Sequence, residues 1–508
     1  MTSHLKTDVL ICGAGAAGLT LAIELARRGV AFRLVEKMAV PFAGSRGKGI
    51  QPRTQEIFED LGILDKVVAA GGIYPPQRTY REDGSFSEYG VVEVVDPTPA
   101  EPYQLALMIP QFLTERILRE RLRELGHRVE FGCELLGFEQ DTNGVTVHLA
   151  GPAGEEVVYA RYLVGADGGR SFVRKALGVD FPGKTLGVRA IVADVVLTGL
   201  GRDAWHQFND GDMKRMVALC PLAGTDLFQL QAPIPLDAQA DLSAEGLTAL
   251  IVERSGRPDI HVHSVSWASA YQMNARLAER YRVGAVFLIG DAAHVHPPTG
   301  GQGLNTSVQD AYNLGWKLAA ALNGAREDLL DSYEAERRPV AAAVLGLSTR
   351  LLDARKQGGM QHGRETRQLD IGYPDSALSK ELPEREVGIR AGDRAPDAPV
   401  RGAAGQSWRL FQLFQGPHWT LLAHEVTLAT VESRPGLQVH HIGTRGDVID
   451  AWGHFRDAYA LAPGECALIR PDGYVGATFD VEQTAKLEIY LARMGLAVGG
   501  TECEAQGT

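Results

Sequence analysis

Cysteine is scarce in this chain of 508 residues, which contains five of them. They are scattered and odd in number, and no two have the spacing Cys-x-x-Cys. This pattern predicts neither a disulfide framework nor a zinc site, and it is typical of a reducing compartment. The cysteines are Cys12, Cys133, Cys220, Cys466 and Cys503.

Long apolar runs are missing as well. The run at residues 318–322 is bounded by Lys317 and Asn323 and falls far short of a membrane span. Residues 9–12 are too short for the apolar region of a signal peptide, and glycines follow them at once. We therefore expect no membrane span, no signal peptide and a cytoplasmic location.

The chain also lacks an excess of basic residues. Lys and Arg number 51 and Asp and Glu number 63, which gives a net charge of -12. A nucleic-acid partner requires a basic face, so none is expected. Hydrophobic residues make up 45% of the chain, enough for sizeable cores, and the length predicts two or three domains.

No nucleophile–base arrangement stands out. The Gly-x-Ser-x-Gly pattern is absent, and His206, His261 and His263 have no evident acid partner. The pair His294 and His296 suggests a metal site, but it lacks a carboxylate partner nearby and two prolines follow. We predict no metal site and assign these two histidines to packing or loop shaping.

What the chain does contain is a glycine loop between an apolar strand and a helix. The loop is Gly13-Ala14-Gly15-Ala16-Ala17-Gly18, and Glu36 ends the next predicted strand, residues 32–36. Glycines there allow a tight turn, close approach to a pyrophosphate and close helix–strand packing, while the acid accepts ribose hydroxyls. The arrangement predicts dinucleotide binding; the alternative is that Glu36 only caps a strand.

Two further motifs follow predicted strands. Asp167-Gly168 begins a helix, where the glycine allows backbone to close on a phosphate, although Asp-Gly is also common in ordinary turns. Asp291 follows the strand at residues 286–289, and residues 300–305 present a helix start. Asp291 could accept a hydrogen bond from a ribityl hydroxyl. The positive end of the helix would stabilise negative charge on the pyrimidine side of a reduced flavin, so the two features together favour a flavin.

These segments together resemble those of the class A FAD-dependent aromatic hydroxylases, typified by para-hydroxybenzoate hydroxylase. The resemblance covers about residues 5–350. Ser45-Arg46-Gly47-Lys48-Gly49 and Gln111 fall where the family has a flavin-contacting arginine and glutamine. One departure is Gly284-Ala285, where many relatives have Gly-Arg.

The resemblance implies an FAD site and assigns no catalytic side chain, because the cofactor carries the chemistry. Pro297 and Pro298 are expected near the ring. The expected cofactor-binding residues are Gly13, Ala14, Gly15, Ala16, Ala17, Gly18, Glu36, Lys37, Arg46, Gln111, Leu135, Asp167, Asp291, Pro298, Gly301, Gly303, Leu304 and Asn305.

It also implies the reaction. NADPH (or NADH) reduces FAD, O2 adds at C4a, and the hydroperoxide hydroxylates a phenolic or polyketide-type aromatic. Only one glycine fingerprint is visible, so NADPH is expected to dock transiently near Arg46 and the Asp167 loop. Epoxidation or Baeyer–Villiger oxidation remain alternatives, as do a nicotinamide dehydrogenase and a flavin-binding protein without turnover. Guesses for residues lining the substrate pocket are Trp205, His206, Met216 and Phe228.

The predicted fold is α/β with three parts. A Rossmann-like FAD-binding domain comprises residues 1–75, 103–180 and 275–356, and an inserted antiparallel β-sheet forms a substrate domain from residues 76–102 and 181–274. Residues 357–399 have the composition of a linker. Residues 391–508 resemble the thioredoxin-like domain of the phenol and polyketide hydroxylase branches. That domain lacks Cys-x-x-Cys, so we expect a structural role or a homodimer contact rather than redox activity.

Overall fold

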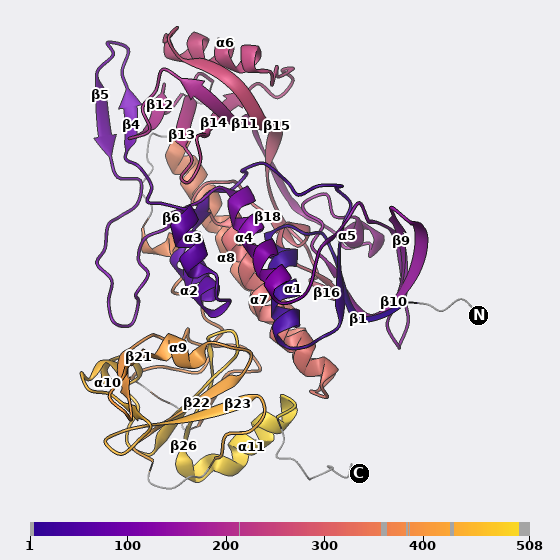
Figure 1. Cartoon of the computed structure of the whole chain (residues 1–508), viewed down its shortest axis with the longest axis vertical. Helices are drawn as coiled ribbons and strands as arrows, with labels where there is room; N and C mark the ends of the chain where they lie inside the picture. The colour runs from indigo at the N-terminus through magenta and orange to yellow at the C-terminus, as the bar shows by residue number, and fades with distance from the viewer. Residues whose placement is uncertain are drawn as a thin grey trace.

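The computed structural model describes residues 5–212, 214–356, 363–382, 385, 387–426 and 431–496. Within these residues the strands form three eight-stranded sheets and one two-stranded sheet. The three large sheets follow one another along the long axis, with the first sheet in the middle (Figure 1). The small sheet pairs β3 (Gly49–Ile50) with β6 (Leu107–Met108).

The first sheet has a parallel centre that is buried on both faces. Its order is β16-β17-β10-β1-β2-β7, with β8 and β9 attached to β10. The apolar run that ends in the glycine loop is β1, whose Val9, Leu10 and Ile11 are fully buried, as expected for a central parallel strand. The strands are β1 (Leu5–Cys12), β2 (Phe32–Glu36), β7 (Glu130–Phe131), β8 (Glu134–Gln140), β9 (Val145–Gly151), β10 (Gly154–Gly165), β16 (Arg282–Val283) and β17 (Val286–Leu288).

Helices cover this sheet, and α1 packs against both α4 and α7. Helix α4 begins at Gln111, and its apolar stripe is buried at Leu113, Ile117, Leu118 and Leu122. The helix start expected at residues 300–305 is found at Gly303, and α7 ends at Leu322. The helices are α1 (Ala16–Arg27), α2 (Pro52–Asp60), α3 (Leu64–Ala70), α4 (Gln111–Glu124), α5 (Phe172–Ala176), α7 (Gly303–Leu322) and α8 (Asp331–Lys356), with short 3-10 turns η1 (Gly290–Ala292) and η2 (Glu327–Leu330).

The second sheet is almost entirely antiparallel and lies at one end of the molecule (Figure 1). One face packs apolar side chains under helix α6 (Ala244–Ser255), which the strand-like pattern of this region did not predict. Strand β15 continues past the predicted domain boundary at residue 274, because it stays paired with β11 and then with β18. The strands are β4 (Gln77–Tyr80), β5 (Phe86–Tyr89), β11 (Gly183–Thr198), β12 (Trp205–Phe208), β13 (Val217–Pro221), β14 (Phe228–Ile234), β15 (His261–Leu277) and β18 (His294–Val295).

The third sheet is mixed: β22 pairs parallel with β23 and antiparallel with β25. Helices α9 (Leu410–Phe414), α10 (His454–Tyr459) and α11 (Thr484–Arg493) flank it, which is consistent with the predicted thioredoxin-like arrangement. The strands are β19 (Lys380–Leu382), β20 (Pro399–Gly402), β21 (Ser407–Arg409), β22 (Trp419–His424), β23 (Leu437–Ile442), β24 (Val448–Ile449), β25 (Glu465–Ile469) and β26 (Val475–Asp480).

The prediction of a plain linker at residues 357–399 was wrong for much of that stretch; residues 357–362 lie outside the described part. Residues 364–366 form the 3-10 turn η3 (Arg364–Thr366), and β19 pairs with β26 of the third sheet. Gly, Pro and charged residues gave this segment the composition of a linker, but Thr366 and Leu369 are buried against the rest of the molecule. None of the described helices is long and apolar enough to cross a membrane.

Candidate functional site

The glycine loop lies at the carboxyl end of β1 and leaves no room for side chains at two of its glycines. Gly13 has φ +107, and a Cβ there would lie 2.3 Å from the carbonyl oxygen of Ala166. A Cβ on Gly18 would lie 2.0 Å from the carbonyl oxygen of Gly13. At Gly15, by contrast, the nearest atom to a Cβ is 3.8 Å away. The loop is therefore tight against the sheet and open on its outer side, as phosphate binding requires.

Glu36 ends β2 beside this loop. Its carboxylate accepts hydrogen bonds from the backbone N–H groups of Ala14 (3.0 Å) and Met38 (3.0 Å). These bonds hold the acid next to the loop. They also agree in part with the alternative that Glu36 caps the end of its strand. Lys37 is exposed, whereas the side chain of Leu135 is buried in the core, so Leu135 offers backbone rather than side chain to a ligand.

The structure brings Arg46 and Gln111 to one place. The backbone N–H of Gln111 donates to Gly47 O (3.0 Å), and Gly47 N–H donates to Oε1 of Gln111 (3.4 Å). The Arg46 side chain is exposed and its guanidinium lies over the rings of Phe42 (5.2 Å) and Trp267 (5.9 Å). Arg46 thus sits where the first and second sheets meet.

Asp167 has one oxygen in use and one available. Oδ2 accepts hydrogen bonds from the N–H groups of Phe172 (2.7 Å) and Val173 (3.1 Å), which begin α5. Oδ1 is buried and has no hydrogen-bond partner among the described residues. A Cβ on Gly13 would lie 3.0 Å from Asp167 Cα, so this free oxygen is close to the glycine loop. A buried carboxylate oxygen without a partner is typical of a site that binds a ligand.

Asp291 follows β17 at the carboxyl edge of the first sheet, inside η1. The residue is accessible to solvent, yet burial by the surrounding chain raises the pKa of its carboxyl, against the opposing charges of His294 and Arg46. The carboxyl is thus accessible at this edge although surrounding chain lies close to it. Pro298 is also exposed, while Pro297 is buried.

Asn305 organises the turn between these prolines and α7. Its Nδ2 donates to Gly301 O (2.6 Å) and Gly49 O (2.9 Å), and its Oδ1 accepts from Gln51 N–H (2.8 Å). Gly300 and Gly301 both have left-handed φ values, +80 and +62, which suit glycine. Gly303 and Leu304 form the first turn of α7, where the free N–H groups make a positive end.

These features fit FAD. The open glycine loop suits a pyrophosphate, Glu36 and Asp291 offer carboxylates at the carboxyl edge of the sheet, and the start of α7 supplies partial positive charge. The unpartnered oxygen of Asp167 marks a hydrogen-bond position that the described residues do not fill. The geometry defines a dinucleotide-binding oxidoreductase site of the flavoprotein kind.

The expectation that His294 has no carboxylate nearby was wrong. Its Nε2 lies 2.7 Å from Oδ2 of Asp310, and Arg337 Nε donates to Oδ1 of the same aspartate (2.8 Å). Asp310 is distant in sequence, and α7 brings it back under the Gly290 turn, where it also accepts from Gly290 N–H (3.1 Å). Burial lowers the pKa of His296 to about 4, which keeps this ring neutral at pH 7. These contacts support a role in shaping the loop.

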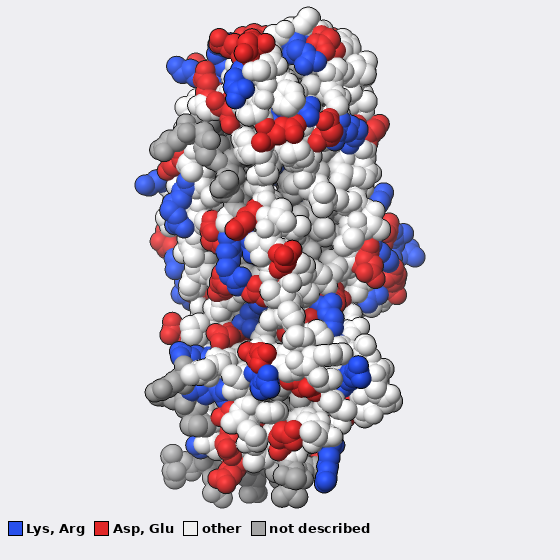
Figure 2. Space-filling model, turned by 90° about the vertical axis from the view of Figure 1, so that its left-hand side faces the viewer, with Lys and Arg blue, Asp and Glu red and all other residues white. Residues whose placement is uncertain are grey.

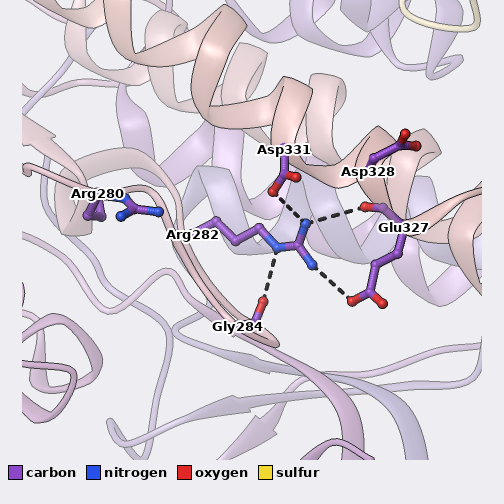
Figure 3. Close-up of a pocket in the computed structure, with 6 residues that line it drawn as sticks. All are labelled: Arg280, Arg282, Gly284, Glu327, Asp328 and Asp331. Carbon is purple, nitrogen blue, oxygen red and sulfur yellow. Dashed lines mark hydrogen bonds and ion pairs between the residues drawn. The ribbon is translucent and has the colours of Figure 1, made fainter. Parts of the chain in front are cut away.

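A separate hollow of about 360 Å³ is lined by Arg280, Arg282, Gly284, Glu327, Asp328 and Asp331 (Figure 3). It surrounds Arg282 at the amino end of β17, where the guanidinium bonds Glu327 (3.0 Å), Asp331 (2.8 Å) and Gly284 O (3.0 Å). Ligands of such sheets bind at the carboxyl ends of the strands. We therefore interpret this hollow as a surface cluster of ion pairs and not as part of the candidate site.

The second sheet turns a polar face toward the Ser45–Lys48 stretch. Asp194 of β11 pairs across the sheet with Trp267 and with Gln229, whose Nε2 donates to Ser45 O (2.5 Å). The apolar residues of the opposite face pack under α6. Phe228, one of the residues guessed to line the substrate pocket, packs on that opposite face. Successive side chains of a strand point to opposite faces of the sheet, and the sequence did not show which face Phe228 would take.

The other three guesses fare differently. Trp205 lies on the polar side, where its ring contacts Lys48 Nζ at 4.3 Å. The imidazole of His206 is occupied by Tyr80 OH (2.9 Å) and Gly201 O (2.8 Å), so it does not point to a ligand. Met216 is buried, and its carbonyl oxygen accepts a hydrogen bond from Nη1 of Arg254 in α6 (2.8 Å).

Replacement of Asp194 by Asn is expected to stabilise the protein above pH 6. Burial raises the pKa of the Asp194 carboxyl to about 6 from an ordinary value of 3.8, with the nearby polar groups of Ser45 and the charge of Lys48 opposing. Because the native pKa is the higher one, ionisation costs stability as the pH rises from about 4 through 6, by roughly 3 kcal/mol when complete. Chemical denaturation of both proteins at pH 4.5 and pH 8 measures this, and a pH-independent difference would contradict it.

Charge on the face drawn in Figure 2 is mixed, with acidic and basic side chains interspersed. Surfaces that bind phosphate are predominantly basic, and this mixed face differs from them. The candidate site lies at the carboxyl edge of the first sheet.

Known proteins agree with this assignment. A family model described as an FAD binding domain matches residues 6–348. A flavin-dependent monooxygenase of Mycobacteroides abscessus is 42% identical over 492 residues, covering 96% of this chain and 99% of that protein. The 12-dehydrotetracycline 5-monooxygenase/anhydrotetracycline 6-monooxygenase of Streptomyces rimosus is 34% identical over 496 residues, covering 93% and 95%. A solved ternary complex of aklavinone-11 hydroxylase with FAD and aklavinone has a TM-score of 0.80 at 28% identity, covering 97% and 99%.

The chain belongs to the flavin-dependent aromatic hydroxylases, the class A FAD monooxygenases. This confirms the predicted family, the monooxygenase chemistry and FAD as the cofactor, and it excludes the nicotinamide dehydrogenase alternative. The predicted α/β fold is confirmed with it.

Proposed function

We propose that this protein hydroxylates an aromatic polyketide with NADPH and O2. Asp291 carries the proposal for the flavin site: it is accessible yet enclosed, and a helix start follows it. Two matched proteins support the substrate class, since one is named for a tetracycline intermediate and the other is complexed with aklavinone.

In this proposal the chain's own residues bind and orient the cofactor, and bound FAD supplies the activation of O2. The glycine loop and Glu36 hold the dinucleotide end, the Asp291 carboxylate accepts a ribityl hydroxyl, and the N–H groups at the start of α7 favour negative charge on the ring. The remaining members of the proposed site are Ala14, Ala16, Ala17, Lys37, Arg46, Gln111, Leu135, Asp167, Pro298, Gly301, Gly303, Leu304 and Asn305.

For the reductant we propose transient docking of NADPH near Arg46 and the Asp167 loop. The sequence has no second glycine fingerprint, and the guanidinium of Arg46 is exposed between Phe42 and Trp267. An exposed cation suits the phosphates of a nicotinamide nucleotide.

We further propose the domain division given by the sequence, with the second sheet as the substrate domain and the third sheet as a structural module. The fully buried pair of Arg470 with Glu336 joins the third sheet to α8, which supports a structural role. A homodimer and a cytoplasmic location remain parts of this proposal.

Asp291→Ala is expected to weaken FAD binding by about 10- to 100-fold, because a charge-assisted hydrogen bond contributes about 1.5–3 kcal/mol. Fluorescence titration of the apoprotein with FAD measures the change. Asp331→Ala is the matched control, since Asp331 pairs with Arg282 at the opposite edge of the sheet. Equal FAD affinity in the Asp291 variant and the wild type would remove Asp291 from the site.

The function itself is tested by following NADPH oxidation against a panel of phenols and aromatic polyketides. The expected result is oxidation stimulated by an aromatic polyketide, with a product heavier by one oxygen. Each of ring hydroxylation, epoxidation and Baeyer–Villiger insertion adds one oxygen, so the connectivity of the product separates them. Flavin-containing protein that no member of the panel stimulates would count against the proposed substrate class.

A further inference from the structure

A glutamine in the segment between α8 and the third sheet has an unusual backbone. Gln368 has φ +62, in the left-handed region, and only 4% of it is exposed. The left-handed conformation is unfavourable for a non-glycine residue, because its Cβ crowds the backbone. Such strain persists only where surrounding structure holds it, and it concentrates at functional sites.

The side chain of Gln368 is fully engaged with the first turns of α7. Nε2 donates to Oε1 of Gln302 (2.7 Å) and to Oγ1 of Thr306 (3.2 Å), and Oε1 accepts from Nε2 of Gln309 (2.6 Å). An amide has both the donors and the acceptor that these contacts need; a carboxylate lacks the donors and an aliphatic chain lacks both. Glutamine is therefore required here for its chemistry as well as its length.

These bonds continue to the glycine turn that precedes α7. Nε2 of Gln302 donates to Gly300 O (2.7 Å) and to Thr366 O (3.1 Å). Gly300 O also accepts from Nε2 of Gln51 (3.1 Å). The carbonyl of Gly300 is thus fixed by two side-chain amides, one of which is held in turn by Gln368.

Both neighbours of Gln368 are anchored elsewhere. Nη1 of Arg367 donates to Oε1 of Gln104 (2.7 Å), and Arg367 O accepts from Arg53 N–H (3.2 Å). On the other side, Leu369 O accepts from Nε of Arg394 (3.1 Å). The segment is held at both ends, which explains how the strained backbone is retained between them.

We propose that Gln368 is a positioning residue, which holds the Gly300 turn and the start of α7 in the conformation that binds the flavin. Residues 363–369 then form an outer support of the site, contributed by a part of the chain beyond the matched FAD-binding region. The inference rests on the flavin site proposed above. It concerns only how that site is held in place.

Two substitutions distinguish the contribution of the Gln368 side-chain amide from that of its left-handed backbone. Gln368→Leu removes the amide and keeps the strain, whereas Gln368→Gly removes both. We expect both apoproteins to bind FAD at least about tenfold more weakly than wild type, with a changed visible absorption band in the flavin-loaded form. Ala460→Gly is the control, because Ala460 is another left-handed residue (φ +47), located beside the third sheet. Its FAD affinity and flavin spectrum should equal those of the wild type.

The thermal unfolding midpoint of each apoprotein shows whether it is folded before titration. If Gln368→Leu does not fold, Gln368→Gly decides, since it carries no backbone strain. Wild-type affinity and spectrum in Gln368→Gly would overturn the inference and leave the proposed function intact. Failure of the wild-type apoprotein to bind FAD would overturn both.

Discussion

Glu336→Gln is expected to destabilise the protein by about 3–5 kcal/mol, although it changes the side-chain volume little. The Glu336 carboxylate lies between two buried cations: Arg470 donates to both of its oxygens (2.7 and 2.8 Å), and Lys317 Nζ lies 2.6 Å from Oε2. The side chains of Lys317 and Arg470 are fully buried. Removing the negative charge leaves those cations without full compensation in a place that water does not reach.

The titration of this cluster has a clear direction. The two cations hold the pKa of Glu336 well below its usual range, against the opposing effect of burial. Burial lowers the pKa of Lys317 to about 8, with Glu336 opposing that shift. Because the native pKa of Lys317 lies below its ordinary value, protonation of this buried amine lowers the stability of the fold, and the full cost is present below about pH 8. The Glu336 carboxylate reduces that cost by stabilising the charged amine.

Urea unfolding at pH 7 measures the effect. Glu120→Gln is the matched control, since Glu120 forms an exposed pair with Arg116 on α4 and should change stability by no more than ~0.5 kcal/mol. A loss of less than about 1 kcal/mol in Glu336→Gln would show that the cluster contributes little. The third sheet would then be joined to the helices of the first sheet mainly by apolar packing, such as Trp316 of α7 against Trp419.

Gly18→Ala is expected to weaken FAD binding at least tenfold, or ~1.4 kcal/mol, even where the protein still folds. The added methyl carbon would lie 2.0 Å from the carbonyl oxygen of Gly13 and 3.4 Å from Ala166 Cβ. A backbone oxygen cannot give way as a flexible side chain can. The start of α1 must therefore move away from β1, which spoils the approach to a pyrophosphate.

Gly346→Ala provides the control within another helix. A Cβ at Gly346 would meet only the end of the Arg350 side chain, at 3.5 Å, so alanine there should stabilise by up to ~1 kcal/mol and leave FAD affinity unchanged. Titration of both apoproteins with FAD separates the two cases. Equal affinities in the two variants would show that the contact between Gly18 and Gly13 is unimportant for binding.

Sequence patterns predicted the parts of the fold whose structure follows from residues that are neighbours in the sequence. A buried strand, a glycine loop and a helix follow one another at residues 9–27, so the first unit could be placed from the sequence. Asp291 could be placed because it follows an apolar strand, and parallel strands collect such residues at one edge. The second sheet was predictable as strands, but the face presented by Phe228 was not, since a shift of one residue reverses every side chain.

The features that escaped prediction depend on contacts distant in sequence. Gln368 lies in a segment of polar and glycine-rich composition, and only its partners in α7 give it a role. Asp310 looked like an ordinary helical residue until α7 brought it to His294. Helix α6 ends at Gly256, which caps it with φ +66, yet its weak apolar periodicity did not distinguish it from the strands around it.

The most direct test is to purify the protein, record its visible spectrum and titrate the apoprotein with FAD. We expect a yellow protein, or a colourless one that binds one FAD per chain and gains a flavin spectrum. NAD⁺ and NADP⁺ should not replace FAD in this titration. A colourless protein that cannot be reconstituted with FAD would contradict the assignment of the carboxyl edge of the first sheet as a flavin site.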